Sequence, residues 1–268
     1  MFEIFSYPFM IRALLIGLLL AISTGLISSF LVSSNQSLLG DGLAHISFTG
    51  VIIGIILSDS PIYIAIPFTI LAAIIIKTLM NFKLQGDASI GLVSTFVIAI
   101  GFIIISLHKG FNQSIEAILV GSIFSTSWLD ILLVSMVTMG LLLFIILAYR
   151  PLLSITFDTN YAKFNKINTH LYDYALTIIT AIIVVLGVKT IGTLLVSAFI
   201  IFPSVSANLI SKSFKGMIIR SVLLNVLITI LGIIIAHYLN LQAGASIIVL
   251  HGMVFVLLYL YKKVRGLE

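Results

Sequence analysis

Residues 129–149 read LDILLVSMVTMGLLLFIILAY, an apolar run whose one charged residue, Asp130, stands next to its start. A bilayer core about 30 Å thick requires roughly 20 mostly apolar residues per helix, so this run is long enough to cross a membrane. From Leu141 to Tyr149 the residues do not alternate between polar and apolar, as they do in a transmembrane β-strand. The run therefore predicts a membrane-spanning α-helix.

Eight further runs of similar length and composition occur along the chain. They cover approximately residues 13–32, 36–57, 61–79, 88–107, 172–188, 190–210, 219–237 and 243–261. No small-residue cleavage pattern follows the first run, which favours a span over a removable signal peptide. The sequence thus predicts an all-α polytopic membrane protein of eight to nine transmembrane helices, in a single transmembrane domain over residues 1–268.

The composition excludes an ordinary soluble enzyme. The chain has 268 residues, of which 60% are hydrophobic and 9% charged, and its mean hydropathy is +1.27. A soluble domain carries about 25% charged residues. Because the chain has no cysteine, a metal site would have to use His, Asp, Glu, Asn or carbonyl oxygens. The sequence also has no Walker loop, so the chain is predicted not to be an enzyme, and ATP-driven work would need an ATPase on another chain.

The basic residues are distributed unevenly between the two sides of the predicted membrane. If all nine runs cross it, one side receives 11 of the 14 Lys and Arg residues. They are Lys77, Lys83, Arg150, Lys163, Lys166, Lys212, Lys215, Arg220, Lys262, Lys263 and Arg265. Lys and Arg are concentrated in cytoplasmic loops, so the C-terminus is predicted to be cytoplasmic and the N-terminus external; eight crossings would reverse the N-terminus. This asymmetry explains the net charge of +5 without a nucleic-acid partner.

The segment between the fourth and fifth runs differs from the other connections. Residues 108–128 combine Lys109, Glu116 and Trp128 with a short apolar stretch at 117–120. We expect an outer loop that contains an interfacial helix, with Trp128 at the membrane surface.

The most informative motif is Gly-Asp-Gly-Leu-Ala-His at residues 40–45, inside the second run. Its spacing places Asp41 and His45 at i and i+4, on one face of a helix. An ionisable residue inside a span is costly unless it faces a cavity, a partner or an ion, which predicts a functional role. A carboxylate and an imidazole form half of a divalent-metal site, for zinc or manganese. In the alternative, Asp41 caps a helix that starts later and His45 bonds a neighbouring helix.

Two other ionisable residues are weaker candidates for metal binding. His251 lies near the centre of the last run. Its possible roles are a third metal ligand, a proton carrier, or a histidine that is hydrogen-bonded to another helix. Asp87 directly precedes a long apolar run, a position typical of a helix N-cap, with metal ligation as the alternative.

Pro203 lies late in the seventh run and is predicted to end that helix early. A short amphipathic helix should follow at the cytoplasmic surface, with Lys212 and Lys215 outward. Its apolar residues Leu209, Ile210 and Phe214 would be available for a groove. Such a helix suits docking into a partner protein, and binding to anionic lipid headgroups is the alternative.

Taken together and in this order, several segments resemble the permease subunits of the manganese and zinc family of ATP-binding cassette importers. The segments are Gly40 to His45 with Gly50; Gly86-Asp87-Ala88-Ser89-Ile90-Gly91; Leu119-Val120-Gly121-Ser122-Ile123; Lys189-Thr190-Ile191-Gly192 through Pro203 to Ser213; and Ala243-Gly244-Ala245-Ser246. The resemblance covers nearly the whole chain.

The resemblance implies a homodimeric permease in a bacterial plasma membrane. Its implied partners are a cytoplasmic ATP-binding subunit that binds the ATP, an extracellular metal-binding protein, a second copy of the chain and membrane lipid. It implies a transported metal and no permanently bound cofactor. Asp41 and His45 would contact the metal. The residues that dock the ATPase would lie in a coupling region at 207–220: Ala207, Asn208, Ser211, Lys212 and Lys215. Zinc is preferred over manganese because the candidate ligands include histidine.

Two copies of Asp41 and His45 related by two-fold symmetry would give four ligands, and alternating access would move the metal. A proton-coupled secondary transporter, in which Asp41, His45 and His251 relay ions and protons, is the main alternative. An intramembrane enzyme is a further alternative, but none of the usual catalytic motifs supports it.

Overall fold

The computed structural model describes residues 7–58, 60–82, 84, 86–108, 121 and 123–264, and in these residues the chain is helical with no strand. The elements are α1 (Pro8–Ser33), α2 (Leu39–Leu57), α3 (Ile62–Asn81), α4 (Gly86–Leu107), the 3-10 turn η2 (Ile123–Ser125), α6 (Trp128–Phe157), α7 (Thr159–Phe164), α8 (Thr169–Ile191), α9 (Thr193–Ile210), α10 (Phe214–Leu239) and α11 (Ala243–Val264). Nine helices of the described part are long and apolar enough to cross a membrane. The predicted all-α membrane fold is confirmed.

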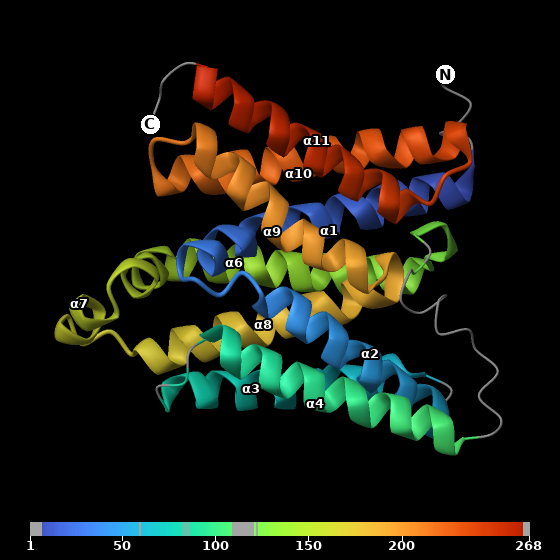
Figure 1. The fold of residues 1–268 in the computed structure, drawn as a ribbon, viewed down its shortest axis with the longest axis horizontal. Coiled ribbons are helices and arrows are strands. Elements are labelled where there is room, and N and C mark those ends of the chain that lie inside the picture. The colour runs from blue at the N-terminus through green and yellow to red at the C-terminus, as the bar shows by residue number, and fades with distance from the viewer. Residues whose placement is uncertain are drawn as a thin grey trace.

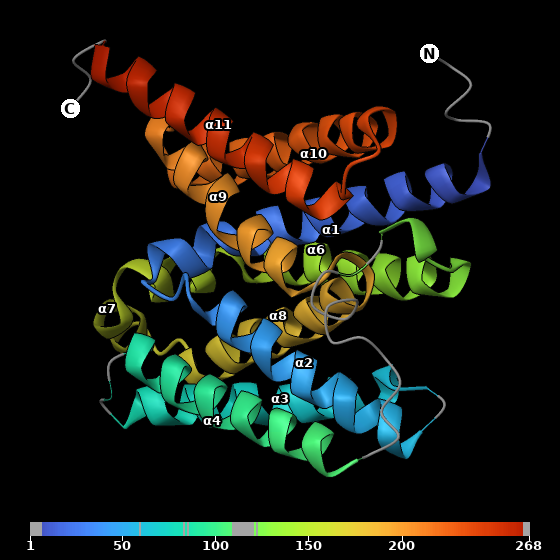
Figure 2. The same ribbon diagram turned by 45° about the vertical axis from the view of Figure 1, so that its right-hand side comes forward.

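The long helices lie side by side along the longest dimension of the molecule (Figures 1 and 2). Helices α2, α3 and α4 pack together on one side, and α10 and α11 pack together on the other. Between them, α1 packs against α6, α9 and α10, and α9 also reaches α2 and α11. The start of α1 and the end of α11 lie at opposite ends of the bundle, with the end of α11 on the side that carries α7 (Figure 1).

The helix boundaries differ from the prediction mainly at charged and polar residues. The run at 129–149 continues past Arg150 and Pro151 to Phe157. After it, Asp158 accepts hydrogen bonds from the backbone N–H of Asn160 and Tyr161 and thereby caps the short α7. The interfacial helix expected at 117–120 lies outside the described residues.

The prediction that Pro203 ends the seventh helix is wrong. Helix α9 continues through Pro203, which is buried, to Ile210. A proline is tolerated inside a membrane helix when neighbouring groups satisfy the backbone that it frees. No separate short helix follows, because the chain bends after Ile210 and α10 begins at Phe214, capped by the Ser213 hydroxyl.

Small and hydroxyl residues hold α1 against its neighbours in the core. A Cβ atom built on Gly25 would lie 2.9 Å from the Cα of Val222, so the glycine allows α1 and α10 to approach closely. One turn further, the hydroxyls of Ser28 and Ser221 are 2.9 Å apart. Such interhelical hydrogen bonds satisfy polar groups that have no water available inside a membrane.

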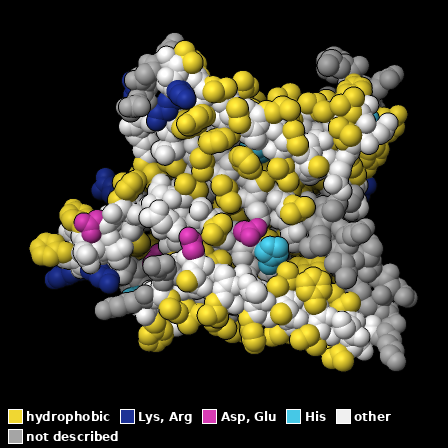
Figure 3. Space-filling model, in the orientation of Figure 1, with side chains coloured by type: hydrophobic (Ala, Val, Ile, Leu, Met, Phe, Trp, Pro, Cys, Tyr) yellow, Lys and Arg dark blue, Asp and Glu magenta, His cyan; other side chains and the backbone are white. Residues whose placement is uncertain are grey.

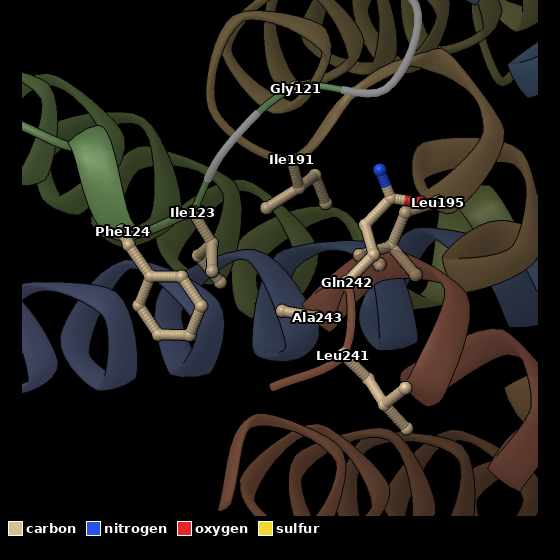
Figure 4. A pocket seen from close by; sticks show the side chains of 9 residues that line it. Gly121, Ile123, Phe124, Ile191, Leu195, Leu241, Gln242 and Ala243 are labelled. Carbon is tan, nitrogen blue, oxygen red and sulfur yellow. The ribbon is translucent and has the colours of Figure 1, made fainter. Parts of the chain in front are cut away.

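The connection between α8 and α9 is the single residue Gly192. Its φ of 85° and ψ of 164° are accessible essentially only to glycine. Gly121 packs directly on it, since a Cβ on Gly121 would lie 2.3 Å from the Gly192 backbone nitrogen. Both glycines are at the end of the bundle opposite α7. There Gly121 and Ile191 line a cavity of about 210 Å³ together with Leu241 at the end of α10 (Figure 4).

We expect Gly192→Ala to lower the free energy of unfolding by about 1 to 3 kcal/mol, because alanine cannot adopt this backbone conformation without strain. Chemical denaturation of the purified protein in detergent measures the change. Gly140→Ala in α6 is the matched control, since a Cβ there meets no atom within 4 Å among the described residues. An equal loss in both variants would contradict the role assigned to the Gly192 backbone.

Candidate metal-binding site

Helix α2 begins near the middle of the molecule and not at one of its ends (Figure 1). After α1 ends at Ser33, Asn35 adopts a left-handed conformation with φ of 56°. The backbone N–H of Gln36 then donates to the Leu31 carbonyl at 2.8 Å, which turns the chain back on itself. As a result, the first turn of α2 lies about halfway along the bundle.

Asp41 lies within this first turn. The helix N-cap is Leu38, which makes no side-chain cap hydrogen bond, so the alternative that Asp41 caps a later helix is wrong. Instead, the Ser197 hydroxyl of α9 donates a hydrogen bond of 2.8 Å to the Asp41 Oδ1 atom. The other carboxylate oxygen, Oδ2, is 3.6 Å from His45 Nε2.

Asp41 and His45 remain accessible at the surface of the single chain. The exposed fractions of their side chains are 46% and 38%. Figure 3 shows an acidic and a histidine side chain side by side near the middle of one face, where Figure 1 places the start of α2. The His45 Nδ1 atom is buried and has no hydrogen-bond partner among the described residues. The exposed carboxylate and imidazole can therefore offer one oxygen and one nitrogen ligand to a divalent metal.

Two glycines explain why the first turn of α2 fits between other helices. A Cβ on Gly40 would lie 2.4 Å from Ile200 Cδ1 of α9, and a Cβ on Gly42 would lie 2.4 Å from Ile90 Cγ2 of α4. Both helices can approach α2 only because these positions lack side chains. The glycines that flank Asp41 in the sequence motif thus position it between α4 and α9.

His251 lies elsewhere, in a buried network between α1, α10 and α11. It is 1% exposed, and its Nε2 is 3.1 Å from Asn225 Oδ1. The Asn225 amide in turn donates to the Ala21 carbonyl and the Thr24 hydroxyl, both at 2.9 Å. The described residues contain no group of three or more His, Cys, Asp or Glu side chains that could hold a metal. These contacts favour the interpretation of His251 as a histidine hydrogen-bonded to another helix.

We expect His251→Leu to retain metal uptake and to lower the free energy of unfolding by about 1 to 3 kcal/mol, because the buried Asn225 oxygen loses its partner. Uptake and thermal unfolding of the same preparation separate the two effects. Loss of uptake at unchanged stability would instead support a direct role of His251 in the ion path.

Asp87 is exposed and is the second residue of α4, so the prediction that it is the N-cap of this helix is wrong. A carboxylate there interacts favourably with the helix dipole. The structure does not bring it into one group with Asp41 and His45. Its predicted role as a metal ligand therefore has no structural support beyond its exposure.

The predicted docking residues lie where α9 meets α10. Asn208, Lys212 and Lys215 are exposed, and Ser211 is half-buried. Ala207 is 0% exposed and thus faces the protein's own core. The expectation that Phe214 is available for a groove is wrong, because its ring packs edge-on against the rings of Phe30 and Phe157, with centroids 5.1 and 5.3 Å away.

Sequence reasoning missed Ser197. It lies within the segment that carries the family resemblance, but a serine in a helix commonly bonds only to its own backbone. Its hydroxyl is also 3.3 Å from the Thr193 carbonyl one turn earlier in α9. Nothing in the sequence distinguishes it from the other helical serines, and only the packing of α9 on α2 places it beside Asp41.

The model of the ABC 3 transport family matches residues 6–262. The chain belongs to this family. It is the membrane-spanning permease of an ATP-binding cassette transporter and a multi-pass protein of the bacterial plasma membrane, as predicted.

Relatives of this permease align over nearly their full length. The manganese transport system membrane protein MntC of Halalkalibacterium halodurans is 28% identical, over 98% of this chain and 91% of the relative. The manganese import system permease protein ScaB of Streptococcus gordonii is 30% identical, over 94% and 90%. A protein of Haemophilus influenzae named as a probable iron transport system membrane protein is 28% identical, over 99% and 94%.

The permease is also similar to a solved structure, PsaBC from Streptococcus pneumoniae in complex with Fab. The TM-score is 0.83 at 29% identity, and the match covers 94% of this chain and 91% of the other.

Proposed function

We propose that this permease imports a divalent transition metal through a site that contains Asp41 and His45. The observation that carries the proposal is the position of this pair: both side chains are about half exposed, and the first turn of α2, which carries Asp41, lies near the middle of the bundle. Ionisable side chains at that depth are not expected to face lipid, so a second protein surface or a water-filled cavity must lie next to them.

A second copy of the chain would both shield this pair from lipid and complete the metal site. One chain offers two ligands in this pair, 3.6 Å apart, whereas a tightly held divalent metal needs four or more. Two-fold symmetry would place two Asp41 carboxylates and two His45 imidazoles around one axis. A site shared between subunits can also open when they move apart, which alternating access requires.

For the metal we propose Mn²⁺. The sequence-based preference for zinc depends on histidine content alone and stays a prediction. A mixed set of carboxylates and imidazoles is compatible with both metals. The relatives MntC and ScaB are named for manganese, which shifts the preference, and the relative named for iron makes iron a third candidate.

For the partners we propose an ATP-binding subunit at the α7 end and an extracellular metal-binding protein at the opposite end. Lys and Arg side chains lie mostly toward the α7 end in Figure 3, which fits a cytoplasmic side and a cytoplasmic C-terminus. Asn208, Lys212 and Lys215 are exposed there in the docking segment, residues 207–220. Ala207 is buried, so it would pack the docking segment against the core of the permease and not contact the ATP-binding subunit.

An uptake assay tests the function. Bacterial cells without their own manganese, zinc and iron importers would express the permease with its ATP-binding subunit and metal-binding protein. Accumulation of radioactive Mn²⁺, Zn²⁺ and Fe²⁺ is then compared with that of cells whose ATP-binding subunit cannot hydrolyse ATP. We expect Mn²⁺ accumulation that needs the active ATPase and resists a protonophore while ATP is maintained.

Other outcomes of this assay have distinct meanings. Accumulation of Zn²⁺ alone would restore the sequence-based choice of metal and leave the site unchanged. Accumulation that ignores the ATPase and stops with the protonophore would replace the proposal with a proton-coupled transporter.

A further inference from the structure

Helix α9 connects two regions that the proposed function keeps separate. Ser197, in its second turn, hydrogen-bonds Asp41 at 2.8 Å. Its last residues, from Ala207 to Ile210, begin the docking segment. Ile210 is the thirteenth residue after Ser197, which corresponds to about 20 Å along a helix. One continuous helix therefore runs from the candidate metal site to the candidate ATPase contact.

Helix α9 contacts the first turn of α2 at two neighbouring positions. Within the described part of the chain, the hydrogen bond that Asp41 accepts from another helix comes from the Ser197 side chain. One turn further along α9, Ile200 fills the space that Gly40 leaves free. Helix α9 thus contacts the first turn of α2 through one hydrogen bond, to Asp41, and one close apolar contact, at Gly40.

The opposite end of α9 is also held firmly. The Arg220 guanidinium of α10 donates a hydrogen bond to the carbonyl of Ile210, which is the last residue of α9. Along its length, Phe199 and Ile200 are buried. Pro203 lies between Ser197 and the docking segment and removes one backbone hydrogen bond of α9, but it is buried. Because packing around the buried proline limits bending there, a shift at the docking segment reaches Ser197.

We propose that Ser197 is a positioning residue that makes Asp41 follow α9, so that movement at the docking segment is passed to the metal site. This inference rests on the proposed function. The hydroxyl acts on Asp41 and does not itself need to contact the metal. Without it, the ATP-binding subunit can still move α9, but the Asp41 carboxylate no longer follows.

The test uses proteoliposomes that contain the complete complex of permease and ATP-binding subunit, supplied with the metal-binding protein and Mn²⁺. The measured quantity is the number of Mn²⁺ ions moved per ATP hydrolysed. We expect Ser197→Ala to lower this ratio about fivefold while ATP hydrolysis continues. Ser197→Thr should restore it, since threonine keeps the hydroxyl and Ser197 is only half-buried.

Ser204→Ala is the matched control on the same helix, because the buried Ser204 hydroxyl has no partner among the described residues. It should keep the wild-type ratio. The inference would be overturned if Ser197→Ala kept the wild-type ratio, including the case in which only its KM for Mn²⁺ rose. It would also be overturned if Ser197→Thr lowered the ratio as much as Ser197→Ala does.

An Asp41→Ala complex, measured in parallel, separates the two proposals. If this complex moves Mn²⁺ like wild type, the proposed metal site itself is wrong, whatever Ser197 does.

Discussion

Replacing Asp41 with alanine is expected to lower metal uptake at least about 100-fold, and His45→Ala should have a similar effect. Loss of a group that only supports a metal ligand typically lowers metal affinity or activity 10- to 100-fold, so loss of a ligand itself should lower it at least as much. Because two-fold symmetry removes two ligands with each substitution, a dimer would lose half of a four-ligand site. Initial rates of Mn²⁺ uptake at matched expression measure the effect.

Asp87→Ala is the control for this prediction. Asp87 is also a carboxylate in the first turn of a membrane helix, but no histidine among the described residues is paired with it. We expect uptake close to that of wild type. If Asp41→Ala and Asp87→Ala behaved alike, or if both Asp41→Ala and His45→Ala kept full uptake, the Asp41–His45 pair would be structural and the metal path would lie elsewhere.

The sequence alone predicted this pair because its spacing is a local property. Residues at i and i+4 share a face of any α-helix, and the 3.6 Å between Oδ2 of Asp41 and Nε2 of His45 follows from that geometry. The position of the pair in the molecule is not local. It depends on the turn at Asn35 and Gln36, which starts α2 halfway along the bundle, and the hydropathy of the run does not encode this turn.

The same distinction between local and tertiary effects explains the other outcomes. Apolar runs of about 20 residues predicted the helices, because every backbone group of a membrane span must be satisfied within the helix. Pro203 misled the prediction because its local effect, a broken helix, is outweighed by the packing of the buried α9. The partners of His251 and Ser197, namely Asn225 and Asp41, come from other helices and have no fixed spacing in the sequence.

The second large effect concerns Lys77, a buried cation in α3. Its Nζ lies 3.3 Å from Asp173 Oδ2 of α8 and donates to Gln36 Oε1 at 3.3 Å. The exposed fraction is 5% for the Lys77 side chain and 27% for Asp173. Breaking a buried ion pair by removing one partner typically costs 3 to 5 kcal/mol. Because Asp173 keeps some access to solvent, we expect Lys77→Met to lower the free energy of unfolding by about 3 kcal/mol, at the lower end of that range.

Denaturation of the purified permease in detergent measures this loss, and two further variants identify its cause. Lys77→Met combined with Asp173→Leu removes both charges and should regain most of the stability, since a buried pair can be replaced by apolar residues at little cost. Lys163→Met, an exposed lysine of α7, should change the free energy by less than about 0.5 kcal/mol. A double variant as unstable as Lys77→Met would show that packing of the lysine stem, and not the unpaired Asp173, is responsible. Because Lys77 also holds Gln36 in the turn that places the start of α2, the single variant should lower metal uptake as well, and the double variant should not restore it.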